Sequence, residues 1–411
     1  MHEYCKVNSD WVKLGTLYIN ICTGRENLTD LKNFSQCIAE ALMKESIDDR
    51  PDVPYCEFAD TIFKHPQLNE VHKTIVGRIG ISVMFFYYRK ELWLKGRRVL
   101  YKFHELKINY KVLKGIAGRE IAASRCAIVN VAVEIFLMGG RLNSAVQTLR
   151  ESDWNIYSAV WPCDQMDVLK RHSLLCSIVQ EALCKSMYSM CFEVLQNLPG
   201  FKESQAEFNV SQYNLLFNKV LNCAVSNRSL SISSSIVDFM VLKKIPIDYN
   251  NLHELITALG HSGLWRKARD QYKRALSLGF YPPLDEHVNN TILYISSLMS
   301  AIEMLLTIER FMVSNSSIIQ LPGGCSQNLQ IILRKISQEK DPSKDSSKDK
   351  DNYHAASERL LEASRLSSPR LFIKHLTVNN RNEQVYTLDH NSCVKWLNGN
   401  RNWAVKVWSY H

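Results

Sequence analysis

Apolar residues recur every three or four positions along most of the chain, which is the period of an amphipathic helix. The pattern is clearest over four segments: residues 10–22, 29–45, 120–137 and 142–151. Residues 68–106 read as two more helices that are divided near Gly96, and a proline-containing break covers residues 48–54. Strand-like alternation is absent before residue 370. The pattern therefore predicts a helical body.

A different pattern begins near the C-terminal end. Residues 336–352 are rich in serine, lysine and aspartate, a low-complexity composition that predicts a disordered linker. An amphipathic helix is predicted over residues 353–366, followed by short strands over 371–378 and 383–388 that form a hairpin. A short helix over 390–397 and an aromatic tail complete a small α+β module.

Residues 261–283 (HSGLWRKARDQYKRALSLGFYPP) raise the question of internal repetition. Gly263 precedes an amphipathic helix, and a short extended exit with two prolines follows it. When this stretch is shifted back by 35 residues, five of its positions align with an earlier predicted helix. The aligned pairs are Ala268 with Ser233, Tyr272 with Val237, Ala275 with Met240, Gly279 with Lys244 and Phe280 with Ile245. A period of this length is typical of tandem helical hairpins.

Two further recurrences extend the repeat in both directions. The triplet Phe-Met-Val occurs at 239–241 and again at 311–313, which is 72 residues or about two periods later. Residues 140–145 (GRLNSA) resemble residues 263–268 (GLWRKA), at a distance of 123 residues. That distance is not a whole number of periods, so we expect insertions or a broken repeat between them, near residues 154–162.

Two families of helical hairpin have a period near 35 residues. The second helix suits a tetratricopeptide repeat, but the first helix, residues 252–260, lacks the Trp-Leu-Gly signature of that family. The stretch is more similar to a pentatricopeptide repeat, with a turn at Gly263 and with Pro282 fourteen residues after Ala268. The expected fold is mainly α, an α-solenoid of degenerate pentatricopeptide/tetratricopeptide-like hairpins with a small C-terminal α+β module. The alternative is an irregular helical domain.

These patterns divide the chain into four expected parts. They are an N-terminal helical hairpin (1–50), a helical-repeat domain (51–335), a disordered charged linker (336–352) and a small C-terminal module (353–411).

Composition places the chain among globular proteins, because 46% of its 411 residues are hydrophobic and 22% are charged. The net charge of +9 is compatible with an acidic partner such as RNA. The 12 cysteines include no CxxC pair, a usage that favours free thiols in the reducing cytosol. The N-terminus has no apolar signal region, and the apolar run at 79–88 is too short for a bilayer, so we expect no membrane association.

Motifs of catalysis are absent from the sequence: it has no GxSxG, no P-loop, no HExxH and no Rossmann fingerprint. We therefore expect no enzymatic activity and no cofactor. His172 and Cys176 lie four residues apart, with Cys163, Cys184 and Cys191 nearby, but this spacing does not enforce four converging zinc ligands. They are interpreted as buried thiols beside a histidine, and no metal site is assigned.

Two basic runs are candidates for contact with RNA, since cations neutralise phosphates and exposed aromatic rings stack on bases. Residues 87–107 have a net charge of +5 with the aromatic residues Tyr88, Trp93, Tyr101 and Phe103 interleaved, and the second run lies in residues 261–283. The candidate nucleic-acid-binding residues are Arg89, Lys95, Arg97, Arg98, Lys102, Arg266, Lys267, Lys273 and Arg274. The alternative is that the aromatic rings belong to the core and the cations form a solvated helix face.

Other polar and aromatic residues have weaker signals. In tandem pentatricopeptide hairpins each repeat reads one base through set positions of its first helix, and Asn214 is near such a position. Trp396, Trp403 and Trp408 form either a platform for bases or peptides or the cap of a small core.

Five stretches together resemble the C-terminal part of the testis- and ovary-specific PAZ-domain-containing family: residues 195–201 (LQNLPGF), 211–219 (SQYNLLFNK), 275–284 (ALSLGFYPPL), 383–388 (EQVYTL) and 394–397 with 403–408 (VKWL, WAVKVW). The resemblance runs from about residue 110 to the end and is weaker before that. It implies a cytosolic germ-cell protein that is required for spermatogenesis around meiosis and is linked to the levels of testis transcripts. Family members are much longer, which implies a fragment or short form.

The family name also implies a PAZ domain, a β-barrel that binds RNA ends. The sequence has no run of strands long enough for one, so no PAZ pocket residues are assigned.

The expected function is that of a non-enzymatic helical-repeat protein in germ-cell RNA regulation, which binds RNA or scaffolds a ribonucleoprotein particle. The alternative is a protein–protein scaffold with no direct RNA contact. Expected partners are RNA, ribonucleoprotein components and other proteins. The sequence leaves open the transcripts, the partner proteins and the oligomeric state.

Overall fold

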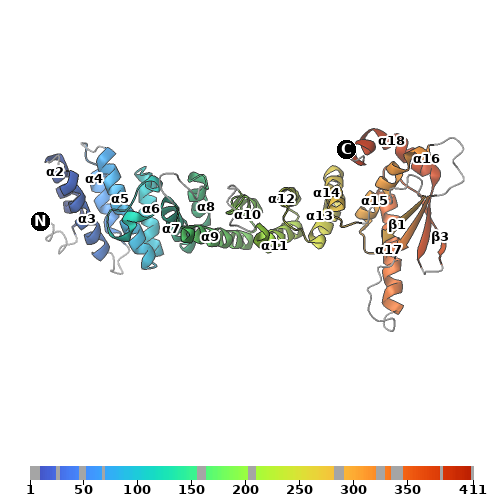
Figure 1. The fold of residues 1–411 in the computed structure, drawn as a ribbon, viewed down its shortest axis with the longest axis horizontal. Coiled ribbons are helices and arrows are strands. Elements are labelled where there is room, and N and C mark those ends of the chain that lie inside the picture. Colours follow the sequence, from blue (N-terminus) through green and yellow to red (C-terminus); the bar gives the residue numbers. More distant parts are fainter. Residues whose placement is uncertain are drawn as a thin grey trace. The chain divides into compact units, whose positions relative to one another are not determined.

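The computed structural model describes residues 10–24, 28–45, 52–66, 70–154, 163–201, 210–281, 291–320, 329–334, 346–379 and 383–408. The chain divides into two compact units, residues 1–209 and 210–411. Figure 1 shows that helices dominate the first unit and that the second combines helices with one sheet. Within the described residues, no helix has the length and apolar character that a bilayer crossing requires.

The described part of the first unit is built of helices. They are α2 (Trp11–Gly24), α3 (Leu28–Glu45), α4 (Pro54–Phe63), α5 (Glu70–Arg89), α6 (Trp93–Glu105), η1 (Tyr110–Val112), η2 (Gly118–Ala122), α7 (Arg125–Met138), α8 (Leu142–Glu151), α9 (Gln165–Cys184) and α10 (Tyr188–Gln196). Helices α5 and α6, α7 and α8, and α9 and α10 pack as hairpins, and the first helices α5, α7 and α9 pack on one another in turn. The predicted stack of helical hairpins is confirmed here.

Two predicted boundaries in this unit are wrong. The division between α5 and α6 falls at residues 90–92, where Glu91 has a φ of 57°, and not near Gly96. Gly96 lies inside α6, where an added Cβ would come within 3.1 Å of Ile135 in α7, so this glycine permits a close helix contact. The helix expected from residue 120 begins at Arg125, because the Ser124 side chain accepts a hydrogen bond from the Ala127 N–H and caps it.

The second unit contains two hairpins followed by a mixed module. Its elements are η3 (Val210–Tyr213), α11 (Asn214–Ser226), α12 (Leu230–Leu242), α13 (Tyr249–His261), α14 (Trp265–Ser277), β1 (Ile292–Ser296), α15 (Ala301–Ser314), α16 (Ser316–Ile319), β2 (Leu329–Arg334), α17 (Ser346–Leu366), β3 (Ile373–Val378), β4 (Gln384–Leu388) and α18 (His390–Trp408). Helices α11 and α12 form one hairpin, α13 and α14 form the next, and α11 packs on α13.

One backbone motif closes the turn of each of these hairpins. A residue with positive φ follows the first helix, and the next N–H donates to the carbonyl five residues earlier, as Leu264 does to Leu259 at 2.9 Å. The turn residues are Glu91, Gly140, Ser186, Arg228 and Gly263. Gly140 and Gly263 are thus hairpin turns, as their shared sequence indicates. Successive turns lie 49, 46, 42 and 35 residues apart, so the repeat length varies along the chain.

The 35-residue period holds between the last two hairpins. Helices α11 and α13 begin 35 residues apart, as do α12 and α14. Five aligned pairs agree: Ser233, Val237 and Met240 are buried like Ala268, Tyr272 and Ala275, Lys244 has positive φ like Gly279, and the Ile245 N–H is bonded like that of Phe280. The predicted repeat is confirmed for these two hairpins.

The 72-residue recurrence of Phe-Met-Val does not reflect the repeat. Residues 239–241 belong to α12, the second helix of a hairpin, whereas residues 311–313 belong to α15, which packs on the first helix α13. A triplet of apolar residues suits any buried helix, so its recurrence carries no positional information.

A four-stranded sheet in the order β1-β2-β4-β3 forms the C-terminal part of the second unit. The expected hairpin is confirmed, because β3 pairs antiparallel with β4. Strand β2 pairs antiparallel with β4, and β1 pairs parallel with β2, with Ile292 opposite Gln330. Two strands therefore precede residue 370, contrary to the prediction. Their residues, ILYIS and LQIILR, are short apolar runs without the clear alternation of a half-exposed strand.

The helices of this module are longer than the sequence pattern indicates. Helix α17 begins at Ser346, inside the segment predicted to be a disordered linker; residues 335–345 lie outside the described residues. Helix α18 continues to Trp408 rather than ending at 397. Residues 301–309 of α15 are buried without exception, and α15 packs against α13, α17 and α18, so this helix is the core of the module.

Candidate nucleic-acid interface

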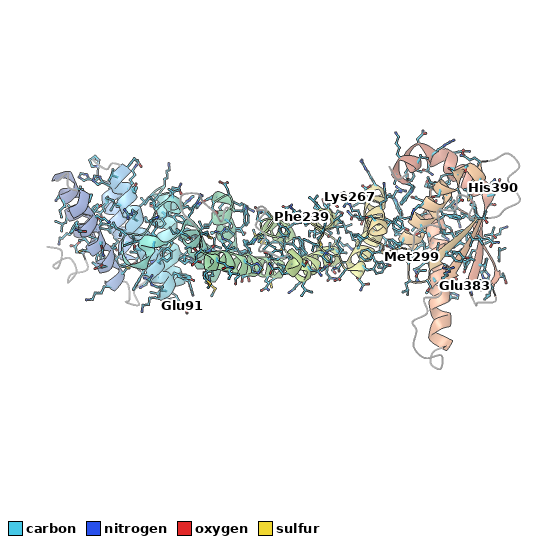
Figure 2. All side chains as sticks on the ribbon, in the orientation of Figure 1. Glu91, Phe239, Lys267, Met299, Glu383 and His390 are labelled. Atoms are coloured by element: carbon cyan, nitrogen blue, oxygen red, sulfur yellow. The ribbon has the colours of Figure 1, made fainter. Side chains whose placement is uncertain are left out.

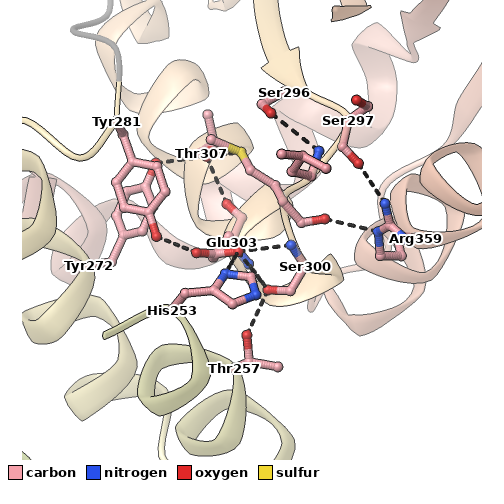
Figure 3. A network of polar contacts seen from close by, with 12 residues as sticks. His253, Thr257, Tyr272, Tyr281, Ser296, Ser297, Ser300, Glu303, Thr307 and Arg359 are labelled. Atoms are coloured by element: carbon pink, nitrogen blue, oxygen red, sulfur yellow. Dashed lines mark hydrogen bonds and ion pairs between the residues drawn. The ribbon is translucent and has the colours of Figure 1, made fainter. Parts of the chain in front are cut away.

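Helix α15 is fixed to α13 by a buried network around Glu303 (Figure 3). Ser300 and Glu303 form a capping box at the start of α15. A Glu303 carboxylate oxygen lies 2.7 Å from His253 Nδ1, and the Tyr281 hydroxyl donates to the other oxygen. This contact raises the pKa of His253 above its usual value. Thr257 Oγ1 donates to Ser300 Oγ at 2.8 Å, which ties α13 to the same helix end.

The preceding hairpin makes equivalent contacts from equivalent positions. Asn218, 35 residues before His253, accepts a hydrogen bond at 2.8 Å from the N–H of Asp248, the residue before α13. Asn222, 35 residues before Thr257, donates to Asn251 Oδ1 of α13 at 2.9 Å. Because the same two positions contact the start of the next helix in both cases, α15 occupies the place that the first helix of another hairpin would take.

Helix α14 is held to α15 and α18 by Arg269. The guanidinium donates from Nε and Nη2 to the two oxygens of Glu309, at 2.8 Å each. The Glu309 side chain is 3% exposed, and burial raises its pKa while Arg269 opposes that shift. The guanidinium carbon also lies 4.1 Å from the ring centroid of Trp403 in α18. Tyr272 of α14 meets Trp408 of α18 edge to face at 5.9 Å, so the two helices lie side by side.

Both α14 and α18 carry cations close in sequence to the residues of this contact. Arg266 and Lys267 are exposed on α14, and Lys273 is half-buried one helical turn after Arg269. Figure 2 labels Lys267 on this helix. On α18, the exposed Arg401 and Lys406 flank Trp403 in sequence. We refer to Arg266, Lys267, Lys273, Arg401 and Lys406 as the α14–α18 basic surface.

The α14–α18 basic surface has little acidic compensation. Asp270 is the acidic residue of α14, and the sequence of α18 contains none. No ion pair joins a member of the surface to another described residue. Trp265, half-buried on α14, and Trp403 of α18 add one indole ring to each helix, and both rings lie near the Arg269 guanidinium. The arrangement suits the phosphate backbone of a nucleic acid.

Arg274 belongs to the second basic run but not to the α14–α18 basic surface, because it is paired with a carboxylate of the protein. It forms an ion pair with Asp238 of α12, and Gln271 Nε2 donates to the same carboxylate at 3.1 Å. Arg274 therefore links the second helices of two neighbouring hairpins, and its charge is already compensated within the protein.

The first basic run lies in the other unit and is largely bound to protein groups. Lys102 contacts Asp60 at 3.0 Å and Glu105 at 2.8 Å, and Arg97 donates to the Gly139 carbonyl at 2.7 Å. Arg89 and Arg98 are exposed and Lys95 is half-buried, and each of these three has an interaction within the chain.

The aromatic residues of this run serve packing. Trp93 meets Tyr88 edge to face at 6.0 Å, and the Tyr88 hydroxyl donates to Glu134 at 2.9 Å. Phe103 is buried between other rings, stacked on Tyr110 at 5.1 Å. Tyr88, Trp93 and Phe103 therefore pack within the protein, while Tyr101 contacts Phe136 at 5.6 Å and is 44% exposed.

The weaker candidates are also placed by the structure. Asn214 Oδ1 accepts a hydrogen bond from Asn218 Nδ2 at 2.5 Å, so its side chain braces the start of α11. Trp396 and Trp408 are buried, and Trp403 is the half-buried member of the three. Cys176 Sγ lies 3.8 Å from His172 Nε2, and in the described part of the chain no third residue of ligand type joins them.

Arg401 and Lys406 are the members of the interface that sequence reasoning missed. The available signal was a run of three cations without an acidic residue in residues 390–408. The helix expected from the sequence ends at 397 and therefore leaves Arg401 and Lys406 out. Their helix α18 meets α14 through the contact between Arg269 and Trp403, which are 134 residues apart in sequence.

Comparisons with known proteins give two results. A protein-family model described as "Putative aspartate racemase" matches residues 2–177, which is less than half of the chain. Among solved structures, the chain is similar to the crystal structure of the pentatricopeptide repeat protein PPR10 from maize, at 13% identity and a TM-score of 0.21. That match covers 97% of this chain and 53% of the maize chain, so this chain spans about half of the length of that protein.

Proposed function

We propose that this chain is a non-enzymatic helical-repeat protein that binds single-stranded RNA through the α14–α18 basic surface and acts in RNA regulation in germ cells. The observation that carries the RNA part is that five cations and two indole rings lie on the two helices that the contact between Arg269 and Trp403 joins. A phosphate chain beside these cations would release condensed counterions, which favours binding without any base-specific contact.

The germ-cell part of the proposal rests on the resemblance to the testis- and ovary-specific family, which is carried by residues 195–201, 211–219, 275–284, 383–388, 394–397 and 403–408. It includes a cytosolic protein that is required for spermatogenesis around meiosis and affects transcript levels. Sequencing of transcripts crosslinked to the protein in testis germ cells tests it. Enrichment of a set of meiotic or post-meiotic transcripts supports the role, and crosslinking no greater than that of a non-binding control protein contradicts it.

Direct binding is tested with the purified chain and a fluorescently labelled single-stranded RNA, by anisotropy over a series of salt concentrations. The double variant Arg266→Glu/Lys406→Glu reverses one charge on each helix of the surface. Its matched control, Arg365→Glu/Lys374→Glu, makes the same change of net charge at exposed positions of α17 and β3 in the same unit. We expect the first variant to lose about tenfold or more in affinity, with a shallower salt dependence.

Equal loss in the control variant would show that only net charge matters and would reject the α14–α18 basic surface as the binding site. Absence of RNA affinity at low salt would reject direct binding. Circular dichroism of both variants verifies that the helices are retained.

A protein–protein scaffold is the second candidate, and the edge strand β3 favours it. From Lys374 to Val378 every residue of this strand is exposed, and Leu376 and Val378 are large apolar residues. Exposed apolar edge strands accept a further strand from a partner. Retention of germ-cell protein partners by a chain without RNA affinity, and their loss in a Leu376→Lys variant, would favour this candidate.

The absence of catalysis belongs to the proposal and is tested separately. The description of the matching family model names aspartate racemisation, so the purified chain is incubated with L-aspartate and the product is resolved on a chiral column. We expect no D-aspartate above the level of a heat-denatured sample, and measurable turnover would overturn this part of the proposal.

A further inference from the structure

Strand β3 is an open edge of the sheet in the second unit. It pairs with β4 on one side, and the strand order β1-β2-β4-β3 leaves its other side without a neighbour among the described strands (Figure 1). From Lys374 to Val378 every residue of the strand is exposed. An edge strand of this kind has unpaired amide and carbonyl groups that can bind one further strand.

A hydrogen bond at the start of β3 shows which of its backbone groups point outward. The Phe372 carbonyl accepts from the Asp389 N–H at 2.8 Å. Hydrogen-bonded and non-hydrogen-bonded pairs alternate between antiparallel strands, so Lys374 is hydrogen-bonded to β4, whereas Ile373 and His375 are not. The N–H and C=O groups of Ile373 and His375 therefore point away from β4, toward the open side of the sheet.

The apolar side chains of this edge are unusually accessible. Phe372 is 55% exposed, Leu376 is 52% exposed and Val378 is 46% exposed. Leu376 is the extra residue of a bulge between His375 and Thr377. Apolar residues of an added strand would remove this surface from water, which favours association.

The same stretch carries positive charge and no negative charge. Residues 363–382 contain no aspartate or glutamate and include the cations Arg365, Arg370, Lys374 and Arg381. Arg370 and Lys374 are exposed, and no ion pair joins either of them to a carboxylate of the described residues. The next acidic residue, Glu383, already accepts a hydrogen bond from Asn379 at 2.8 Å. A complementary partner therefore carries carboxylates.

The two kinds of side chain lie on different faces of the sheet. Ile373 is opposite Leu388 and Val378 is opposite Gln384, so both are on one face, while Lys374 is on the other. A strand that complements β3 thus has apolar residues at every second position and acidic residues between them.

A second copy of β3 fits this edge less well than an acidic strand. Pairing of two copies would add the cations of one strand to those of the other, and like charges destabilise paired strands. Lys374 and the bulge at Leu376 are also features by which edge strands avoid pairing with themselves.

We propose that β3 is the docking edge for an extended segment of a partner protein in which acidic residues alternate with apolar ones. The segment adds to the sheet as a further strand. Its backbone bonds to Ile373 and His375, its apolar side chains cover Val378, and its carboxylates lie near Lys374. This inference rests on the second candidate of the proposed function, for which it names the partner, and it does not require RNA binding.

The test uses the purified full chain and a fluorescently labelled synthetic peptide in which glutamate alternates with valine, and binding is measured by anisotropy. We expect saturable binding. Replacement of the glutamates by lysine removes the charge pairing, and N-methylation of alternate amides removes the strand hydrogen bonds. Each change should weaken binding by about tenfold or more.

Charge reversal on the protein separates this edge from the RNA surface. Arg370→Glu/Lys374→Glu should weaken the acidic peptide by about tenfold or more and leave RNA affinity unchanged. Its matched control, Arg266→Glu/Lys406→Glu, makes the same change of net charge on α14 and α18 and should bind the peptide as the native chain does. Failure of this inference and failure of the RNA proposal therefore give different results.

A third variant keeps the test valid if the charge reversal prevents folding. Ile373→Pro removes an outward N–H at the first residue of an edge strand, where proline is tolerated, and should also weaken the peptide. Four outcomes would overturn the proposal: no saturable binding, equal binding of the lysine peptide, equal loss in the control variant, or displacement of the peptide by single-stranded RNA. A dimer of the chain that Ile373→Pro dissociates would assign the edge to a second copy and would overturn it too.

Discussion

Arg269 and Glu309 form a two-fold hydrogen-bonded ion pair between α14 and α15, with both N···O distances at 2.8 Å and a carboxylate that is almost fully buried. The guanidinium has a second role, since the Trp403 ring lies 4.1 Å from it. One side chain thus joins a hairpin of the repeat to two helices of the C-terminal module.

Loss of this pair should destabilise the second unit strongly. Arg269→Ala leaves the Glu309 carboxylate buried without a partner, which typically costs about 3–5 kcal/mol. We expect a lower midpoint of urea denaturation in this variant, while Arg266→Ala, an exposed change one turn away, stays within about 0.5 kcal/mol of the native chain. Equal midpoints for the two variants would contradict the importance of the pair.

The two 35-residue repeats allow a matched test of the turn conformation. Gly263 has a φ of 72°, and a Cβ added there would meet no atom within 4 Å, so Gly263→Ala carries a backbone penalty of about 1 kcal/mol without a clash. Arg228, the equivalent residue, has a φ of 55°, so Arg228→Gly should relieve a similar strain and stabilise the chain. Thermal unfolding measures the midpoint temperature of both variants. Midpoint shifts of the same sign would contradict a backbone penalty at positive φ as the cause.

Stability should depend on the protonation of His253. Contact with Glu303 raises its folded-state pKa above the usual 6.5, so the ion pair stabilises the folded protein fully below that value. The contribution is lost as the pH rises through the raised pKa. We therefore expect the difference in unfolding free energy between the native chain and His253→Asn to be largest below pH 6.5 and to shrink as the pH rises above that value.

The comparison with the variant is needed because other histidines act in the opposite direction. Burial lowers the pKa of His72 and His172 in the first unit, and these groups destabilise the folded state at low pH. A difference between native chain and variant that stays constant with pH would contradict the ion pair.

Salt dependence gives a quantitative test of the α14–α18 basic surface. Each phosphate contact on a single strand contributes about 0.7 to the slope of log affinity against log salt. Lys267→Ala and Arg401→Ala should each reduce the slope by about that amount, whereas Arg274→Ala should leave it unchanged because Arg274 is paired with Asp238. A reduced slope for Arg274→Ala would place RNA on the face between α12 and α14 instead.

The local features of this fold could be predicted from sequence, and the long-range ones could not. Gly140 and Gly263 indicate their turns because a positive φ favours glycine, and the same turns at Glu91 and Arg228 have no such signal. The hairpin of β3 and β4 alternates enough to be recognised. Strand β1 is recognisable only with its partner β2, which lies 38 residues later in sequence.

The candidate sites show the same limit. Arg266 and Lys267 stand out in a basic run, but the helix of Arg401 meets theirs through a packing contact that no local pattern encodes. Outside these sites, Arg171 of α9 looks like an ordinary surface cation in sequence, and its burial beside Cys126 follows from the stacking of α7 on α9. Sequence spacing alone cannot tell a buried cation from a solvated one.

The contacts of His253 and Thr257 with α15 also fix where the stack of hairpins ends. Helix α15 takes the position of a next first helix, but it packs against α17 and α18 instead of beginning another hairpin of the same kind. Gly260 is adapted to this neighbour, since a Cβ there would lie 2.5 Å from Ile302, whereas Val225 occupies the equivalent position one repeat earlier. Helix α15 therefore acts as a terminal cap of the stack of hairpins. A strand of RNA that followed the hairpins toward α15 would meet the last repeat of the stack at α14.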